Sequence, residues 1–366
     1  MLENNSHDEE LLLRKHAAKG EFEKVQEILD GNRNNGSSRF NIDSQSSNGN
    51  TALHWACFKA VEIYEGNSAD YSKTIQLLIQ YGANYLSVNK IKKKPCDLFR
   101  ESDEYLNSLH AGLIKEGSCY FSLMHSILKK ECQKITLPSE LEGESAIATG
   151  LYSIIDGLKL IEFFPKKEHE DSFTILSLAC GISNEILPLI LYFQHHNKKI
   201  NYIGIDNNNA IIEDNRARYK AYENVRFFCA DASNSSEMSV IIPSHAIDFG
   251  IMRNGDFTES NGRQHIFCQI VNQVFPKLIK PDYPILMTFQ TEYELNICNI
   301  KTQLNHNFRK FRKGNFFDNG KRCSFSTQRG NESILTYPDR YSFILNLDPK
   351  PANQNQLSHS MQKLRM

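Results

Sequence analysis

Between residues 173 and 290, short apolar runs alternate with segments long enough for helices, and this alternation constrains the fold more than any other feature of the chain. The apolar runs are residues 173–180, 201–206, 225–231, 246–253 and 284–290. Strands that are apolar along their whole length and separated by helices are typical of a parallel sheet covered on both faces. We therefore expect a ligand at the carboxyl ends of these strands, where the strand order reverses.

The loop after the first apolar run has the small residues that close contact with a ligand requires. Gly181 lets the backbone approach a ligand closely, and Ala179 and Ser183 on either side of it are nearly as small. The next helix is expected to begin near Ser183 or Asn184, because both residue types are good N-caps.

Carboxylates follow the second and third runs. Asp206 is placed to accept hydrogen bonds from both hydroxyls of a ribose. Asp231 could accept one from an adenine amino group, while neighbouring backbone N–H groups donate to the ring nitrogens. Each has a structural alternative, since Asp206 could cap the following helix and Asp231 could simply end a strand. Two carboxylates at consecutive strand ends favour a nucleotide-containing cofactor.

In this order, the loops resemble the motifs of the class I S-adenosylmethionine-dependent methyltransferases. The first motif of that family, D/E-x-G-x-G-x-G, aligns with residues 177–183 and keeps only Gly181. Ser177 stands at the acidic position, and Ala179 and Ser183 stand at the outer glycines. The resemblance implies a doubly wound, mostly parallel, seven-stranded Rossmann-like sheet over residues 145–347, with S-adenosylmethionine as cofactor and S-adenosylhomocysteine as product. The cofactor-binding residues that it implies are Ala179, Cys180, Gly181, Asp206, Asn207, Asp231, Ala232 and Arg253.

The same loops bear on other functions of this fold. A nicotinamide cofactor would need a second glycine against its pyrophosphate, where Ile182 and Asn184 crowd the chain. The end of the fourth run, MRNGDF, lacks the N-P-P-[YF] signature of methyltransferases that act on nucleic-acid bases. Arg253 there is expected to hold an anionic group, either the carboxylate of the cofactor or the substrate. The alternative for Arg253 is an ion pair with Asp256 or Glu185.

The catalytic base and the methyl acceptor, a protein or a small molecule, stay unassigned. Asp256 and His265 follow the fourth run closely enough in the sequence to be candidates for the base, but neither is singled out by a pattern. Asp248 begins its run away from the ligand edge and is interpreted as structural. A second hypothesis therefore stands beside the enzyme: an adaptor whose methyltransferase-like domain binds cofactor but is inactive.

The first hundred residues contain a weak internal repeat. Residues 49–60, GNTALHWACFKA, and the helical stretch 71–89 resemble the ankyrin repeat, whose signature is T-P-L-H-x-A followed by a helix ending in G-A. A degenerate unit precedes it at residues 11–31, and a fragment of a third follows at 92–99. The resemblance implies an ankyrin-repeat helical stack over residues 8–115 that binds a protein partner. His54 is interpreted as structural, and Trp55 as repeat packing or a partner contact.

The composition indicates a soluble protein of a reducing compartment, interpreted as cytoplasmic. Lys and Arg number 42 against 43 Asp and Glu, which gives no general reason to expect a nucleic-acid partner. The nine cysteines contain no C-x-x-C pair, so no metal site is predicted. No apolar run approaches the roughly 20 residues of a membrane span.

The remaining segments complete the domain prediction. Residues 116–144 are expected to form a helical connection and residues 348–366 a disordered tail. The basic cluster at residues 309–313 (Arg309, Lys310, Arg312 and Lys313) is interpreted as a charged edge strand, or else as a surface for an acidic partner. Ankyrin repeats joined to an enzyme domain also resemble effectors that intracellular bacteria deliver into host cells, which adds the hypothesis of delivery into a host.

Overall fold

The computed structural model describes residues 3–34, 40–62, 68–100, 118–165, 171–255, 263–289, 291–301, 308–315, 324–325, 335–336 and 341–347. The chain divides into two compact units. The first, here the helical unit, comprises Met1–Ser153 and Phe325–Ser333, and the second, the sheet unit, comprises Ile154–Ser324 and Ile334–Met366. The predicted tail at 348–366 lies outside the described residues.

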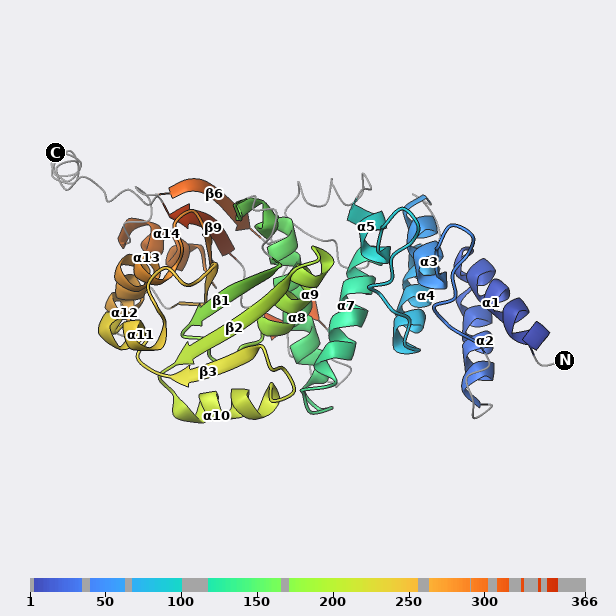
Figure 1. Ribbon diagram of the computed structural model, residues 1–366, viewed down its shortest axis with the longest axis horizontal. Helices are drawn as coiled ribbons and strands as arrows, with labels where there is room; N and C mark the ends of the chain where they lie inside the picture. Colours follow the sequence, from blue (N-terminus) through green and yellow to red (C-terminus); the bar gives the residue numbers. More distant parts are fainter. Residues whose placement is uncertain are drawn as a thin grey trace. The chain divides into compact units, whose positions relative to one another are not determined.

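The helical unit is a stack of helix pairs (Figure 1). Its helices are α1 (Glu3–Ala17), α2 (Phe22–Asn34), α3 (Ala52–Glu62), α4 (Ser68–Gln80), α5 (Pro95–Arg100) and α7 (Cys119–Cys132). The predicted units 11–31 and 49–89 correspond to the first two pairs. Fully buried aliphatic side chains from successive helices form the core, among them Leu13, Leu29, Leu53, Ile75 and Leu78.

The segment predicted as a connection contains α7, which packs against α4. The Ser72 hydroxyl lies 3.4 Å from the Cys119 thiol, and Lys130 Nζ donates to the Ile79 carbonyl oxygen at 3.4 Å. Ankyrin-like stacks need about three repeats to cover their core. The helix α7 therefore adds a packed layer to the stack instead of only linking it to the next segment.

The turn that opens α3 is held by a buried histidine. His54 is fully buried, and its Nδ1 accepts from the Thr51 hydroxyl at 2.9 Å and from the Thr51 N–H at 3.3 Å. Its Nε2 donates to the Lys93 carbonyl oxygen at 3.0 Å, just before α5. Burial lowers the pKa of His54, so the ring is neutral with its proton on Nε2. The predicted structural role of His54 is confirmed.

The sheet unit contains the predicted parallel sheet. Its strand order is β3-β2-β1-β4-β5-β9-β6, and β1 to β5 are parallel whereas β9 is antiparallel to both β5 and β6. The strands are β1 (Ser172–Leu178), β2 (Lys199–Asp206), β3 (Val225–Cys229), β4 (Phe249–Arg253), β5 (Pro284–Phe289), β6 (Phe308–Asn315) and β9 (Tyr341–Leu347). Two short strands, β7 (Ser324–Phe325) and β8 (Leu335–Thr336), pair separately. The predicted basic cluster falls on β6, at one edge of the sheet.

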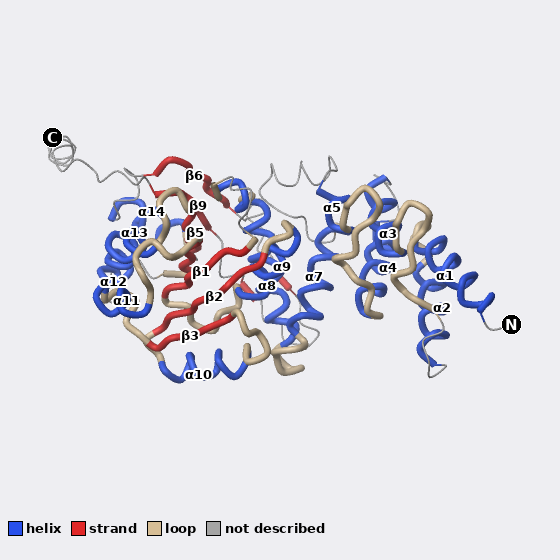
Figure 2. The backbone as a smooth tube through the Cα atoms, viewed as in Figure 1, coloured by secondary structure: helices blue, strands red, loops and turns tan. Residues whose placement is uncertain are grey.

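Helices connect the parallel strands (Figure 2). They are α9 (Ile186–His195), α10 (Asn209–Arg218), α11 (Ser235–Ile241), α12 (Gln264–Gln269), a π-helical turn η2 (Ile270–Val274), α13 (Phe275–Leu278) and α14 (Glu292–Lys301). Upstream lie α8 (Leu141–Gly157), within which the chain passes between the units, and the 3₁₀ turn η1 (Leu160–Phe163). The strand order runs outward from β1 to β3 and then reverses to β4 and β5. The switch point therefore lies between β1 and β4, where α/β sheets bind ligands.

Membrane-spanning helices and metal-ligand clusters are both absent from the described residues. None of the helices there combines the length and the apolar character that a membrane span requires. Within the same residues, no three His, Cys, Asp or Glu side chains cluster as metal ligands would.

Candidate functional site

The loop after β1 keeps the backbone conformation of a glycine-rich loop with a single glycine. Ala179 has φ = 54°, Gly181 has φ = 49° and Ser183 has φ = 54°. These are the three positions that align with the glycines of the methyltransferase motif. Left-handed backbone costs a non-glycine residue about 1 kcal/mol or more. The surrounding structure must therefore hold this loop in place.

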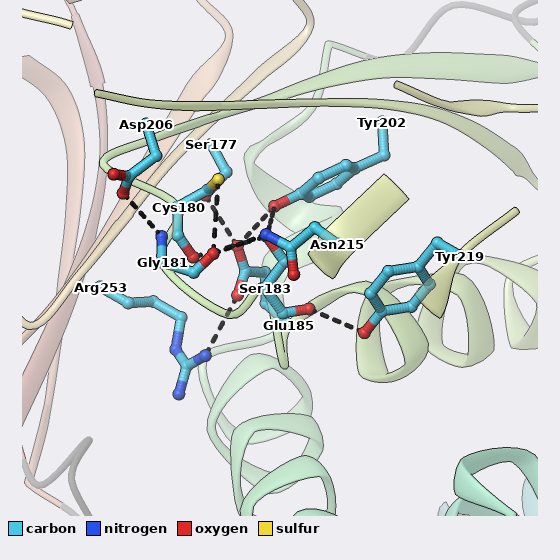
Figure 3. Close-up of polar contacts among 10 residues, drawn as sticks. All are labelled: Ser177, Cys180, Gly181, Ser183, Glu185, Tyr202, Asp206, Asn215, Tyr219 and Arg253. Atoms are coloured by element: carbon cyan, nitrogen blue, oxygen red, sulfur yellow. Dashed lines mark hydrogen bonds and ion pairs between the residues drawn. The ribbon is translucent and has the colours of Figure 1, made fainter. Parts of the chain in front are cut away.

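Side chains from α10 and the segment after it hold the loop (Figure 3). Asn215 Nδ2 donates to the Gly181 carbonyl oxygen at 2.6 Å and to Ser183 Oγ at 3.3 Å. The Tyr219 hydroxyl donates to the Ser183 carbonyl oxygen at 3.0 Å. Both donors are buried. The carbonyl groups of Gly181 and Ser183 thus have hydrogen-bond donors inside the protein, which offsets the strain of the left-handed residues.

Asp206 joins this loop to the end of β2. Its Oδ2 accepts from the Gly181 N–H at 3.0 Å and its Oδ1 from the Asn208 N–H at 2.9 Å. Asn208, not Asp206, caps α10, so the alternative that Asp206 caps this helix is wrong. Each carboxylate oxygen has about two acceptor positions, so each can accept one further donor. The predicted neighbour Asn207 is exposed on the same loop.

Asp231 lies at the corresponding place after β3. Its Oδ1 accepts from the N–H and the hydroxyl of Ser233 at 2.9 and 2.7 Å, while its Oδ2 has no partner among the described residues. The residue is exposed, and Ala232 beside it is buried. The Ala230 N–H donates to the Asp206 carbonyl oxygen at 3.0 Å, so the loops after β2 and β3 are adjacent.

Behind the loop lies a buried carboxylate that the sequence patterns do not single out. Glu185 is 1% exposed, and its Oε1 accepts from the Ser177 hydroxyl at 2.7 Å and from the Tyr202 hydroxyl at 2.6 Å. Its Oε2 pairs with Arg253 Nη1 at 3.1 Å, which realises one of the alternatives weighed for Arg253 (Figure 3). Burial and the Glu185 carboxylate raise the pKa of Tyr202 well above its usual value, so this hydroxyl stays a donor.

This carboxylate bonds to the residue at the acidic position of the methyltransferase motif. Ser177 stands at that position, and its hydroxyl contacts Glu185 Oε1. The site therefore has a carboxylate beside the end of β1, brought there from the start of α9. The single sign of this in the sequence is an acidic residue in an otherwise apolar helix start.

Cys180 fills the space beneath the loop. Burial raises the pKa of its thiol far above the usual value, which favours the neutral thiol. A Cβ on Gly204 in β2 would lie 3.1 Å from Cys180 Sγ and 2.7 Å from the Phe227 ring. A glycine in the middle of β2 thus makes room for the packing that supports the loop.

The structure brings most of the predicted cofactor residues to one end of the sheet and corrects one prediction. The loop residues, Asp206 and Arg253 are linked through the contacts above, and Asp231 follows the adjacent strand. The predicted start of the helix at Ser183 or Asn184 is wrong: α9 begins at Ile186 after Glu185, without a side-chain cap. The reason is that Ser183 adopts left-handed backbone and its hydroxyl bonds within the loop. His265 is exposed, and Asp256 lies outside the described residues.

Comparison with known proteins adds three findings. Residues 48–90 match the ankyrin repeat family. No curated protein sequence matches the chain. Solved structures that resemble it include a SAM-dependent O-methyltransferase from Thermotoga maritima, at 11% identity over 62% of this chain and 73% of that one with a TM-score of 0.37.

Two further solved structures are similar at the same distant level. A SAM-dependent methyltransferase from Aquifex aeolicus is 13% identical over 60% of this chain and 97% of that one, with a TM-score of 0.32. The CurJ carbon methyltransferase is 11% identical over 81% of this chain and 91% of that one, with a TM-score of 0.35.

Proposed function

We propose that the sheet unit binds S-adenosylmethionine and transfers its methyl group to an acceptor. The observation that carries the proposal is the hydrogen bond between Asp206 Oδ2 and the Gly181 N–H at 3.0 Å. It joins a left-handed, close-approach loop to a carboxylate at the next strand end. Such a pair can hold a ribose beside a backbone that leaves room for the rest of the cofactor.

The neighbouring strand ends support an adenosine. The remaining acceptor positions of Asp206 suit two ribose hydroxyls, because a carboxylate can accept several hydrogen bonds. Asp231 and the Ala232 N–H, after the adjacent β3, suit the amino group and a ring nitrogen of adenine. Cys180 contributes the apolar floor of the loop.

The charges at this end of the sheet favour a cationic cofactor over a phosphate. The carboxylates of Glu185, Asp206 and Asp231 stand against the guanidinium of Arg253, which is already paired with Glu185. A pyrophosphate at the start of α9 would meet the buried Glu185. S-Adenosylmethionine carries no phosphate, and its positively charged sulfonium is stabilised by nearby negative charge. This comparison disfavours the nicotinamide alternative.

When bound, the cofactor supplies a methyl group that its sulfonium has already activated. The contribution of this chain is alignment, since in-line transfer gains most from proximity and orientation. The network of Asn215, Tyr219 and Asp206 fixes the loop against which the cofactor would lie. No residue is assigned as general base.

Calorimetric titration with S-adenosylhomocysteine and, separately, with NAD⁺ tests the proposal on the full chain. We expect binding of S-adenosylhomocysteine and none of NAD⁺. Binding of NAD⁺ alone, or of neither ligand, would contradict the proposal. The inactive-adaptor alternative is favoured by two replaced glycines, and binding without transfer of labelled methyl groups to any acceptor in a lysate would support it.

We propose further that the helical unit binds a protein partner, through an aromatic pair on α3. Trp55 and Phe58 stack edge to face at 6.1 Å between ring centroids, and Phe58 is 38% exposed. Photo-crosslinking from position 58 should capture a protein, and capture equal to that from a distant exposed position would contradict it. Delivery into a host cell stays a prediction, which a reporter fused to the chain and followed during infection would test.

A further inference from the structure

A cavity lies at the outer edge of the sheet, between β3 and the carboxyl end of α10. Its volume is about 440 Å³, which is within the range of small-molecule sites. β3 is the last strand on this side of the sheet, and α10 packs beside it (Figure 1). The residues that line the cavity include none of the predicted cofactor residues. The cavity is therefore a second candidate site, apart from the one at the carboxyl ends of the strands.

Positive charge predominates in the lining. Its cations are Arg216, Lys220 and Arg226, whereas its acidic residue is Glu223. Lys220 and Arg226 are exposed, and neither side chain has an ion-pair or hydrogen-bond partner among the described residues. Arg226 lies on a strand, so its charge does not serve to complement a helix dipole. Two unpaired cations on neighbouring elements can both donate to one anionic group, and a phosphate has the acceptors for this.

Arg216 closes the backbone edge of β3 within the cavity. The Tyr202 N–H donates to the Asn224 carbonyl oxygen, so alternate residues from Asn224 onward pair with β2 and the Phe227 carbonyl points outward. Nε and Nη2 of Arg216 donate to this carbonyl oxygen at 3.3 and 2.7 Å. The guanidinium thus occupies an acceptor that an added peptide strand would need. Side chains, not the strand edge, are left to hold a ligand.

The aromatic part of the lining is held in place by contacts within the protein. The Tyr219 ring lies 5.9 Å from the Tyr222 ring and 5.9 Å from the Phe227 ring, between centroids. The Tyr219 hydroxyl is bonded to the Ser183 carbonyl oxygen, which fixes the ring. Tyr222 and Phe228 are half-buried, so part of each ring is accessible from the cavity. Accessible aromatic rings beside cations are the combination on which nucleotide bases stack.

We infer that this cavity binds a nucleotide, with the phosphate at Lys220 and Arg226 and the base against Tyr222 and Phe228. Phosphate alone would leave the rings and most of the volume unused, and a neutral ring compound would leave the cations unpaired. A free nucleotide and a residue of single-stranded RNA present the same base and phosphate, so both are sources of this ligand. The inference stands apart from the proposed function, because the two sites share no ligand-binding residue.

Calorimetric titration of the full chain with uridine 5′-monophosphate, uridine and inorganic phosphate tests the class of ligand. The uridine nucleotide is chosen because it lacks the adenine that the candidate cofactor site would hold. We expect it to bind at least about tenfold more tightly than uridine or phosphate, since it alone engages both the rings and the cations. No binding of the nucleotide, or equal binding of uridine or phosphate, would overturn the inference.

A short uridine oligonucleotide distinguishes the two sources. Tighter binding of the oligonucleotide, with a steep loss of affinity as salt rises, would assign the site to a residue of single-stranded RNA. Equal affinity of the oligonucleotide and the mononucleotide would assign it to a free nucleotide. Both outcomes support the site.

Charge variants locate the phosphate. Lys220→Gln and Arg226→Gln should each weaken binding of uridine 5′-monophosphate about fivefold, because both cations are exposed to solvent. Glu223→Gln should strengthen binding about threefold, since it removes a negative charge from the lining. Lys199→Gln is the control, because Lys199 is an exposed cation on β2 outside the lining. Equal losses in Lys199→Gln and Arg226→Gln would show a general attraction by positive charge and overturn the inference.

Two further variants locate the base and separate the two sites. Phe228→Leu keeps an apolar side chain but removes the ring, so binding of uridine 5′-monophosphate should weaken about tenfold. Asp206→Ala changes the candidate cofactor site and should leave binding of this nucleotide unchanged. If Asp206→Ala abolishes binding while Phe228→Leu has no effect, the nucleotide occupies the cofactor site and the inference is wrong.

Discussion

The turn that opens α3 and the loop that follows β1 are both tight bends, but side-chain hydrogen bonds define the first and backbone conformation defines the second. In the α3 turn, side chains make the structure: the Thr51 hydroxyl donates to the His54 ring, and the ring donates to the Lys93 carbonyl. In the β1 loop, backbone conformation makes the structure, and three residues take positive φ whether or not they are glycine. The first region keeps its sequence signature, whereas the second loses most of its own.

This difference explains why one sequence motif is kept and the other is not. One ring at His54 both accepts from Thr51 and donates to the Lys93 carbonyl, so a change there removes several bonds at once. A left-handed φ can be adopted by Ala179 or Ser183 at a modest cost when Asn215 and Tyr219 bond the turned carbonyl groups. A glycine signature can therefore fade while the loop survives.

The largest expected effect lies in the α3 turn. His54→Ala should destabilise the helical unit by about 3 kcal/mol, because a buried ring that accepts from Thr51 and donates to the Lys93 carbonyl is lost and a cavity takes its place. Denaturation followed by the fluorescence of Trp55, the single tryptophan, reports this unit. His7→Ala is the control, since the His7 side chain is 79% exposed. If both variants lowered the free energy of unfolding equally, the buried bonds of His54 would not be what stabilises the α3 turn.

Next in size is the buried network behind the β1 loop. Tyr202→Phe should cost about 2 kcal/mol, since Glu185 loses one of its donors in a buried setting. Chemical denaturation of the sheet unit, followed by circular dichroism, measures the loss. Tyr293→Phe is the control, because Tyr293 is 62% exposed. A neutral Tyr202→Phe would mean that the hydroxyl does not support the carboxylate.

The helical unit should also lose stability in weak acid. Burial lowers the pKa of His54 and of His125, so the folded state binds the proton less readily than the unfolded state. This stability is present above about pH 6.5 and is lost as the pH falls through the lowered values. Each tenfold difference in proton affinity between the two states corresponds to about 1.4 kcal/mol of stability. In His54→Ala, the dependence on pH measured through Trp55 should be weaker, and an unchanged slope would contradict the assignment.

The smallest expected effect is a gain. Ala179→Gly should stabilise the sheet unit by about 1 kcal/mol, because glycine adopts φ = 54° without strain. Ala217→Gly, at an exposed site within α10, should cost about the same amount. If both changes destabilise the protein, the left-handed loop after β1 is not the conformation in solution.

The sequence patterns predicted the parallel strands and the carboxylates Asp206 and Asp231, because these depend on local periodicity and on position after a strand. They named Glu185 only as one alternative partner of Arg253, and they did not predict Tyr202 or Asn215, because these side chains reach the loop only through tertiary packing. Nor did they predict the left-handed φ of Ala179 and Ser183, since neither residue type favours it. The packing of α7 on α4 was missed because a single helix carries no repeat signature.

The central claim is that a carboxylate at the end of β2 and the loop after β1 bind one cofactor. Calorimetric titration of S-adenosylhomocysteine into Asp206→Ala and into Asp214→Ala, an exposed site on α10, tests it most directly. We expect Asp206→Ala to bind at least about a hundredfold more weakly, from two lost hydrogen bonds to a charged group, and Asp214→Ala to bind as the unchanged protein does. Equal affinity in both variants would contradict the account.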